Sequence, residues 1–427
     1  MLGEHWCTAT VQRAFAAKPR NVLKQRQAMS NVRPLLTALV LTLALTRGAT
    51  AAPPATGPSA DSSWPKNVAQ SMDVYGRLDG QLAFTKDDVK IANNSSRIGF
   101  KVEQSVFDKL TVLGGGEWKM SLGTGDTTYN ITENPDTGLG TFQTTTNQAF
   151  STRLGFIGVR FGKCGTLTLG KQWGVYYDVS SWTDLYTTFG THGSSTFNAG
   201  TDGGQTGEGR ADSALAYRVV VGALRIGVQA QFLPQRSPVV DGLSASAVYQ
   251  LGAGFRIGAA YSHSFLDFGT TPIAGYDGKD AQAFTAGISF DRLGWKVAAV
   301  NTWTHDHEIV RTPSAAVMYD TLGAELYLSR RFRDLVQVFT GLDFAIPRGL
   351  DARFVNPNYG TRDVLLGARL LLDNKAGSFV YLEGRTGGTR DANGTRADSV
   401  VMLGIRFVYS LRRAFELEAL PEPRLAP

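Results

Sequence analysis

Charged side chains stand at alternate positions within residues 95–103. Arg97, Lys101 and Glu103 share one parity, whereas the isoleucine, phenylalanine and valine between them take the other. Successive side chains of a β-strand point to opposite faces, so the segment predicts one charged wall and one apolar wall. Fixed charges of this kind attract or repel ions and orient water without any covalent step. The chemistry expected here is therefore electrostatic.

Residue types suited to catalysis or metal binding are few. Four of the five histidines lie beyond residue 51, and none stands in a nucleophile motif such as G-x-S-x-G. We therefore expect no enzymatic activity and no cofactor. The run His305-Asp306-His307-Glu308 has the residue types of a metal site, because His305 and His307 would share a strand face. The run falls where an exposed loop is expected to begin, so no metal site is predicted.

Residues 1–51 have the pattern of a secretory signal peptide. The apolar run from Pro34 to Leu45 follows Arg33 and, at about twelve residues, is too short to span a bilayer as a helix. Ala49-Thr50-Ala51 then supplies a small-x-small cleavage signal. Translation from Met29 would give the leader a simpler basic region, so we expect the true start there.

The net charge of +6 belongs to this leader. Residues 1–51 contain seven Lys or Arg and one acid, which leaves 36 basic and 36 acidic residues beyond them. A neutral chain gives no support for a nucleic-acid partner. Cys164 is the single cysteine beyond the leader, so no intramolecular disulfide is expected. No apolar run there reaches the length of a membrane helix, so a membrane-spanning chain would have to form a closed barrel.

The alternation of residues 95–103 returns along most of the chain beyond Met72. We place sixteen strands there, most of them about 9–13 residues long, which is the length a tilted barrel strand needs. A flexible tail is expected over 52–71, and a C-terminal tail over 412–427. The strands begin near Met72, Ser95, Lys109, Gln148, Gly165, Ser213, Leu224, Asp241, Phe255, Asp280, Trp295, Met318, Leu335, Thr361, Ser378 and Asp398.

The connectors alternate in length as well. Tight turns such as Phe107-Asp108 follow the even strands, whereas mostly long polar segments such as 123–147 and 179–212 follow the odd ones. This sorting is typical of a barrel with short periplasmic turns and long external loops, and a soluble sheet has no reason for it. The predicted fold class is all-β: a 16-stranded antiparallel transmembrane β-barrel over residues 72–411.

Short motifs in the first half of the barrel resemble those of the general, non-specific trimeric porins of Gram-negative outer membranes. Each match is weak alone, but their order and spacing together are specific. The resemblance covers nearly all of 72–409 in architecture, and its motifs concentrate in 74–218. They are Val74-Tyr75-Gly76-Arg77, Arg97-Ile98-Gly99-Phe100-Lys101, Thr152-Arg153-Leu154-Gly155-Phe156, Gly174-Val175-Tyr176-Tyr177-Asp178 with Thr183-Asp184, and Arg210 eight residues before Arg218.

The resemblance implies that the third external loop, about 179–212, folds inward and narrows the lumen. It places basic residues on the wall and acidic residues on the loop, with Lys101 and Glu103 also facing the lumen. One departure is Thr188, where the family often has a glutamate, and it leads us to expect weak selectivity for anions. The implied constriction residues are Arg77, Arg97, Arg153 and Arg210 on the wall, and Asp178, Asp184 and Thr188 on the loop.

The expected function is an outer-membrane porin: a water-filled channel for passive diffusion of ions and small hydrophilic solutes. The alternative is a substrate-selective, sugar-type channel, for which aromatic residues near the loop entry would provide a stacking track. Expected partners are the solutes, outer-membrane lipids and two further copies of the chain in a homotrimer. Lys171 has outward parity, which would be costly in lipid, so we expect it at a subunit interface opposite Glu133 or Asp136 of a neighbour.

Overall fold

The structure is a computed structural model in which strands account for most of the described residues. Among these residues, no helix is long and apolar enough to cross a membrane. The described residues are 72–122, 125–129, 142–146, 150–196, 206–233, 240–266, 274, 280–312, 316–373 and 377–410. The predicted leader, the two predicted tails, Glu133 and Asp136 lie outside them.

Nineteen strands are formed by the described residues, and sixteen of them make one closed ring. The strands of the ring are β1 (Met72–Phe84), β3 (Arg97–Phe107), β4 (Leu110–Met120), β7 (Phe150–Phe161), β8 (Thr166–Trp173), β9 (Arg210–Val221), β10 (Leu224–Gln231), β11 (Gly242–Gly252), β12 (Phe255–Ser264), β13 (Ala281–Arg292), β14 (Trp295–Arg311), β15 (Ala316–Phe332), β16 (Val336–Arg348), β17 (Thr361–Leu371), β18 (Phe379–Gly387) and β19 (Val400–Ser410).

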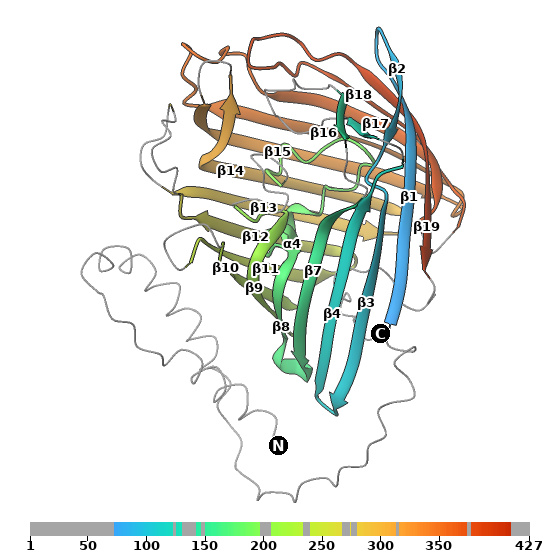
Figure 1. The fold of residues 1–427 in the computed structure, drawn as a ribbon, viewed down its shortest axis with the longest axis vertical. Coiled ribbons are helices and arrows are strands. Elements are labelled where there is room, and N and C mark those ends of the chain that lie inside the picture. Colours follow the sequence, from blue (N-terminus) through green and yellow to red (C-terminus); the bar gives the residue numbers. More distant parts are fainter. Residues whose placement is uncertain are drawn as a thin grey trace, which may run out of the picture.

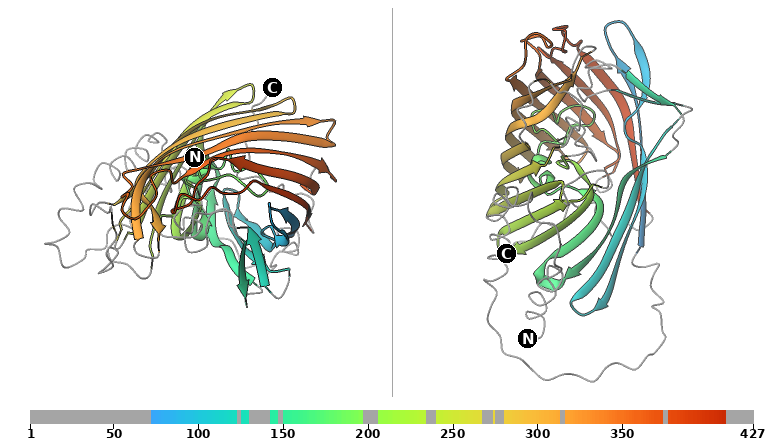
Figure 2. Two further views of the ribbon diagram at one scale, coloured as in Figure 1. Left: turned by 90° about the horizontal axis from the view of Figure 1, so that it is seen from above. Right: turned by 60° about the vertical axis from the view of Figure 1, so that its left-hand side comes forward.

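The ring closes because β1 pairs with β3 on one side and with β19 on the other (Figure 1). Each strand of the ring pairs antiparallel with its neighbours in chain order. The views in Figure 2 show the strands curving round a central space. The prediction of sixteen antiparallel strands is therefore confirmed, and every strand begins within three residues of its predicted start.

Three further strands lie in connectors that the sequence predicted as loops. β2 (Val89–Asn93) pairs with residues 80–84 of β1, whereas β3 pairs with residues 72–77. β1 and β2 therefore form a hairpin that continues past the end of β3. β5 (Gly125–Tyr129) and β6 (Phe142–Thr146) pair only with each other, as a separate hairpin within the predicted loop 123–147. A long connector can thus satisfy its backbone groups in a local ladder outside the ring.

The side chains of the ring are arranged with apolar residues outside and polar residues inside. On β1, Leu78 and Leu82 are 40% and 37% exposed, whereas Asp79 and Gln81 between them are 0% and 4% exposed. Lipid solvates an apolar outer face, while the charges gain partners or water inside. The segment that includes Arg97 and Lys101 follows the same rule, because Arg97 lies directly opposite Arg77 of β1.

The connector between β8 and β9 folds into the ring and lies against its inner wall. It begins at Gly174, five residues before the predicted loop start, and includes α4 (Tyr177–Ser180), which contacts β11, β12 and β13 (Figure 1). The Trp182 ring lies over Gly258 and Gly287 of the wall, where a Cβ would come within 2.9 Å and 3.1 Å of it. The two glycines place no side chain between the wall and the Trp182 ring, so the loop rests directly on the wall backbone.

Candidate pore constriction

Arginines from the inner wall gather on one side of the ring. Arg77 and Arg97 are cross-strand neighbours on β1 and β3, and Arg153 lies on β7. Arg210, the first residue of β9, is 6% exposed and lies with its guanidinium 5.9 Å from the Trp173 ring. The structure thus brings all four predicted basic residues to the first strands of the ring.

Glu117 of β4 stands among these arginines and was not predicted from the sequence. Its carboxylate accepts a hydrogen bond from Arg153 Nε at 2.7 Å and lies 3.6 Å from Arg97 Nη1. The Tyr75 hydroxyl donates to its other oxygen at 3.1 Å. Glu117 lies directly opposite Gly99, so its register could have placed it on the face of Arg97. The wall therefore carries an internal acid.

Arg77 is held by the hairpin that joins β1 to β3. Its guanidinium donates to the carbonyl oxygens of Asn94 and Ser95 at 2.9 Å and 3.2 Å, and lies 3.8 Å from Asp79. Asp79 is bound more closely by Arg406 of β19, at 2.6 Å. Arg77 therefore retains much of its positive charge toward the interior.

Asp184 of the loop faces the arginine side. It accepts a hydrogen bond from the Tyr177 hydroxyl at 2.5 Å, and Tyr177 stacks on Trp173 at 4.3 Å. Burial raises the pKa of the Asp184 carboxyl above its ordinary value, and the Tyr177 hydrogen bond and the nearby arginines offset this only in part. The negative charge of the loop is consequently weaker at low pH than that of an ordinary aspartate.

Asp178, which the resemblance implies at the constriction, binds the wall at the base of the loop. Its carboxylate binds Arg218 Nε at 3.0 Å and the Ser246 hydroxyl at 3.0 Å. Its carbonyl oxygen accepts from Trp182 Nε1 at 2.9 Å. The two carboxylate contacts join the base of the loop to the wall, and the carbonyl contact lies within the loop. Asp178 therefore anchors the loop.

Thr188 also contacts the wall, where its side chain meets β1 and the hairpin that follows it. Its hydroxyl donates to Gln81 Oε1 at 2.8 Å, and Asn94 Nδ2 lies 3.5 Å away. The backbone N–H groups of Thr187, Thr188 and Phe189 donate to the Glu383 carboxylate at 2.7, 3.0 and 3.0 Å. Three such donors to one charged acceptor hold the tip of the loop firmly against β18.

Two further wall carboxylates hold the next part of the loop. Glu325 of β15 accepts from the Thr183 hydroxyl at 2.6 Å and from the Thr191 backbone N–H. Asp343 of β16 accepts from the Gly193 backbone N–H at 2.7 Å and lies 2.9 Å from His192 Nδ1. These acids lie on correctly predicted strands, but their partners depend on the path of the loop.

The returning part of the loop is tied to the wall by a buried ion pair. Glu208 Oε1 lies 3.2 Å from His307 Nε2 of β14, and both side chains are 1% exposed. Burial would raise the pKa of Glu208, but the charge of His307 and the hydrogen bonds of His307, Thr206 and Ser262 together leave the pKa below its ordinary value. Residues 206–209 are therefore held against β14 just before the chain enters β9.

Lys101 and Glu103 lie on the same face of β3 as Arg97. Lys101 Nζ lies 5.6 Å from the Tyr75 ring. Glu103 binds Arg160 of β7 through two hydrogen bonds of 2.9 Å and 3.1 Å, and both side chains are more than one third exposed. Lys171 instead points outward beside a register shift in β8 and binds Asp212 of its own chain at 3.3 Å.

A closed antiparallel ring with an apolar exterior, a charged interior and an inward loop defines the class of outer-membrane β-barrels. The model of the family described as Gram-negative porin matches residues 66–326, and this chain belongs to that family. The chain lies in the outer membrane of a Gram-negative bacterium.

Relatives and solved structures agree with this assignment. The chain is 33% identical to outer membrane porin N of Escherichia coli (strain K12), over 52% of this chain and 58% of that protein. It is 30% identical to outer membrane porin C of Enterobacter cloacae, over 55% of this chain and 63% of that protein. The matched region thus spans less than two thirds of either relative. Salmonella typhi OmpF, in complex with daunomycin, shares the fold with a TM-score of 0.62 at 21% identity, over 79% of this chain and 97% of that one.

Proposed function

We propose that this protein is a general diffusion channel, a water-filled pore through which ions and small hydrophilic solutes pass passively. One observation carries the proposal: a loop crosses the inside of the ring and brings Asp184 toward a wall that carries Arg77, Arg97 and Arg153. Opposed charges across confined water set up a transverse field that discriminates solutes by charge and dipole. The relatives are channels by name, and we propose that this chain likewise has no enzymatic activity.

The selectivity we propose is weak and favours anions. Four arginines stand at the constriction, and Glu117 neutralises part of the charge of Arg97 and Arg153. On the loop, Thr188 supplies no charge, and burial disfavours the charged form of Asp184. The balance of charge among these constriction residues is therefore positive.

The burial of four of the six aromatic residues near the loop entry weighs against the sugar-selective alternative, and the other two, the half-buried Trp173 and Tyr177, stack on each other. Tyr176, Trp182, Tyr186 and Phe189 are 0%, 3%, 7% and 3% exposed. Each packs between the loop and the wall, as Trp182 does over Gly258. A stacking track for sugars needs exposed ring faces, and these rings cannot supply them.

We propose a homotrimer whose outer faces otherwise contact membrane lipid. The outward Lys171–Asp212 pair, between β8 and β9, is a charged group on an apolar exterior and would be costly against lipid. A subunit interface that covers this pair would remove the cost.

Planar bilayers test the channel proposal. Purified protein added to a bilayer in KCl should produce stepwise current increments, in groups of three if trimers insert. Stable protein insertion without any current would contradict an open channel. A conductance that millimolar maltose blocks would favour the sugar-selective alternative.

A further inference from the structure

A row of polar side chains faces outward at one end of β12 to β15. His263, Gln282 and His305 lie directly opposite one another on three successive strands, and Asp320 of β15 hydrogen-bonds to His305. The next outward row toward the middle of the strands is Tyr261, Phe284, Trp303 and Leu322. The polar row thus lies beyond an aromatic belt, at the end of β14 far from its tight turn, where side chains meet water and head groups.

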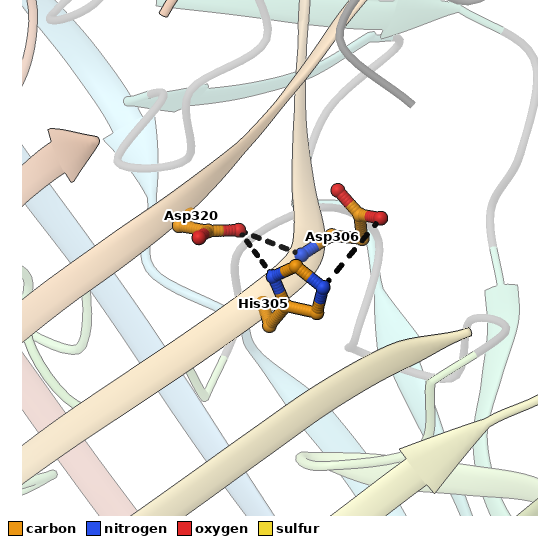
Figure 3. A group of neighbouring side chains, drawn as sticks. All are labelled: His305, Asp306 and Asp320. Atoms are coloured by element: carbon orange, nitrogen blue, oxygen red, sulfur yellow. Dashed lines mark hydrogen bonds and ion pairs between the residues drawn. The ribbon is translucent and has the colours of Figure 1, made fainter. Parts of the chain in front are cut away.

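Two carboxylates flank the His305 ring, one beside each nitrogen (Figure 3). Asp320 Oδ1 lies 2.9 Å from His305 Nδ1 and also accepts the Asp306 backbone N–H at 3.0 Å. Asp306 Oδ2 lies 3.9 Å from His305 Nε2, which is too far for a hydrogen bond. One ligand atom from each of the three residues lies within 4.8 Å of the other two.

A bulge in β14 creates this arrangement. The pairing of β14 with β15 shifts register between Thr304 and Glu308, and Asp306 has a φ of 45°. In a regular strand Asp306 would point to the face opposite His305. The bulge re-aims its carboxylate toward the imidazole, and aspartate is among the residues that tolerate a positive φ.

We propose that His305, Asp306 and Asp320 form a binding site for a divalent transition-metal ion such as Zn²⁺. Zinc bonds to histidine nitrogen and carboxylate oxygen are about 2.0–2.2 Å long, so two ligands of a tetrahedral ion are about 3.4 Å apart. The 3.9 Å between His305 Nε2 and Asp306 Oδ2 is within about 0.5 Å of that spacing, a movement that a small rotation of the Asp306 carboxylate supplies. Asp320 on Nδ1 then orients the ring, as a carboxylate on the other nitrogen of a metal-bound histidine commonly does.

A second outward histidine offers a matched control. His263 Nε2 lies 3.1 Å from Asp280 Oδ2, a direct hydrogen bond. Among the described residues, no third metal-ligating group lies close enough to join this pair. His263 lies in the same outward row as His305 and also pairs with an aspartate. Among the described residues, however, no second carboxylate joins its ring. Removing His263 should therefore leave metal binding intact.

Zinc titration of the purified, tag-free protein, stripped with a chelator, tests the site by calorimetry. We expect saturable binding of one ion per chain, lost in His305→Asn and in Asp306→Asn, weakened about 10- to 100-fold in Asp320→Asn, and unchanged in His263→Asn. Trp303 gives an independent readout, because its ring stacks on His305 at 6.0 Å between centroids. Cu²⁺ bound at this site should quench the fluorescence of Trp303. This component of the quenching should be absent in Trp303→Phe, which lacks the indole.

Loss of the metal site can be told apart from a failure to fold, and zinc binding is measured independently of any ion current. Each variant is first checked for the heat-resistant band of a folded barrel, and Trp303→Phe should keep calorimetric zinc binding. Absence of saturable binding to the folded protein would overturn the site. Binding that survives in His305→Asn, or that disappears in His263→Asn, would overturn the assignment of its ligands.

Discussion

Arg153 and Glu117 form an ion pair on the same wall of the ring, with Arg153 Nε 2.7 Å from Glu117 Oε1. Arg97 Nη1 lies 3.6 Å from the same carboxylate oxygen. The basic wall is therefore a network in which one acid holds two arginines in place. Such an acid reduces the positive potential of the wall while it fixes the geometry of the charges that remain.

Glu117→Gln should make the channel more selective for anions. The substitution keeps the shape of the side chain and removes its negative charge, so Arg97 and Arg153 act on the pore without compensation. Two unit charges about 4 Å apart in water interact by about 1 kcal/mol. This energy corresponds to about a fivefold change in the ratio of anion to cation permeability. Reversal potentials in a KCl gradient measure this ratio.

Glu103→Gln is the matched control for that substitution. Glu103 lies on the same inner face, but its partner is Arg160 and both side chains are more exposed to solvent. Its loss should change the permeability ratio less than the loss of Glu117. An equal change in the two variants would contradict a special role for Glu117.

Asp184 should make selectivity depend on pH. Its pKa is raised, so the carboxyl gains its charge at a higher pH than an ordinary aspartate does. Cation permeability should consequently increase with pH through that window. Reversal potentials recorded across a pH series test this, and Asp184→Asn should flatten the dependence. A variant with the full pH dependence would place the titrating group elsewhere.

Glu383→Ala should loosen the tip of the inward loop. The substitution removes the acceptor of three backbone N–H groups, and hydrogen bonds to charged groups contribute about 1.5–3 kcal/mol each. We expect larger current noise and a higher mean conductance in single-channel records. Glu383→Gln keeps one carbonyl oxygen as acceptor and should have a smaller effect. Quiet records of unchanged size from the alanine variant would mean that the other tethers suffice.

Gly323→Ala should displace the loop from β15. A Cβ at this position would collide with the Gly193 backbone, so the loop has to move toward the centre of the pore. The single-channel conductance should therefore decrease. Gly384→Ala is the control, because its Cβ would meet no atom closer than 3.7 Å. Equal conductance in both variants would show that the loop does not rest on Gly323.

The strands were predictable because each has a period of two and a buried face. Side chains on β1 and β3 alternate between lipid and interior, and this alternation fixes both the strand and the direction in which Arg77 and Arg97 point. The connectors gave no such signal. The pairings of β2 with β1 and of β5 with β6 depend on polar segments whose alternation is not tied to burial.

The site was predictable only in part, because its loop side depends on a tertiary path. Motif order placed Asp178 and Thr188 at the constriction, whereas their contacts are with Arg218 and Gln81 of the wall. Glu383 could not be recognised as a tether, since its partners are backbone N–H groups about 195 residues away. Glu117 could have been found from its register opposite Gly99.

The most direct test compares the wild-type channel with Arg97→Gln/Arg153→Gln in planar bilayers under a KCl gradient. The wild type should give stepwise currents with a reversal potential that favours anions. The double variant should still conduct, with its reversal potential shifted toward cations. Stepwise currents whose reversal potential is the same in both proteins would contradict the arginine wall as the element that sets selectivity.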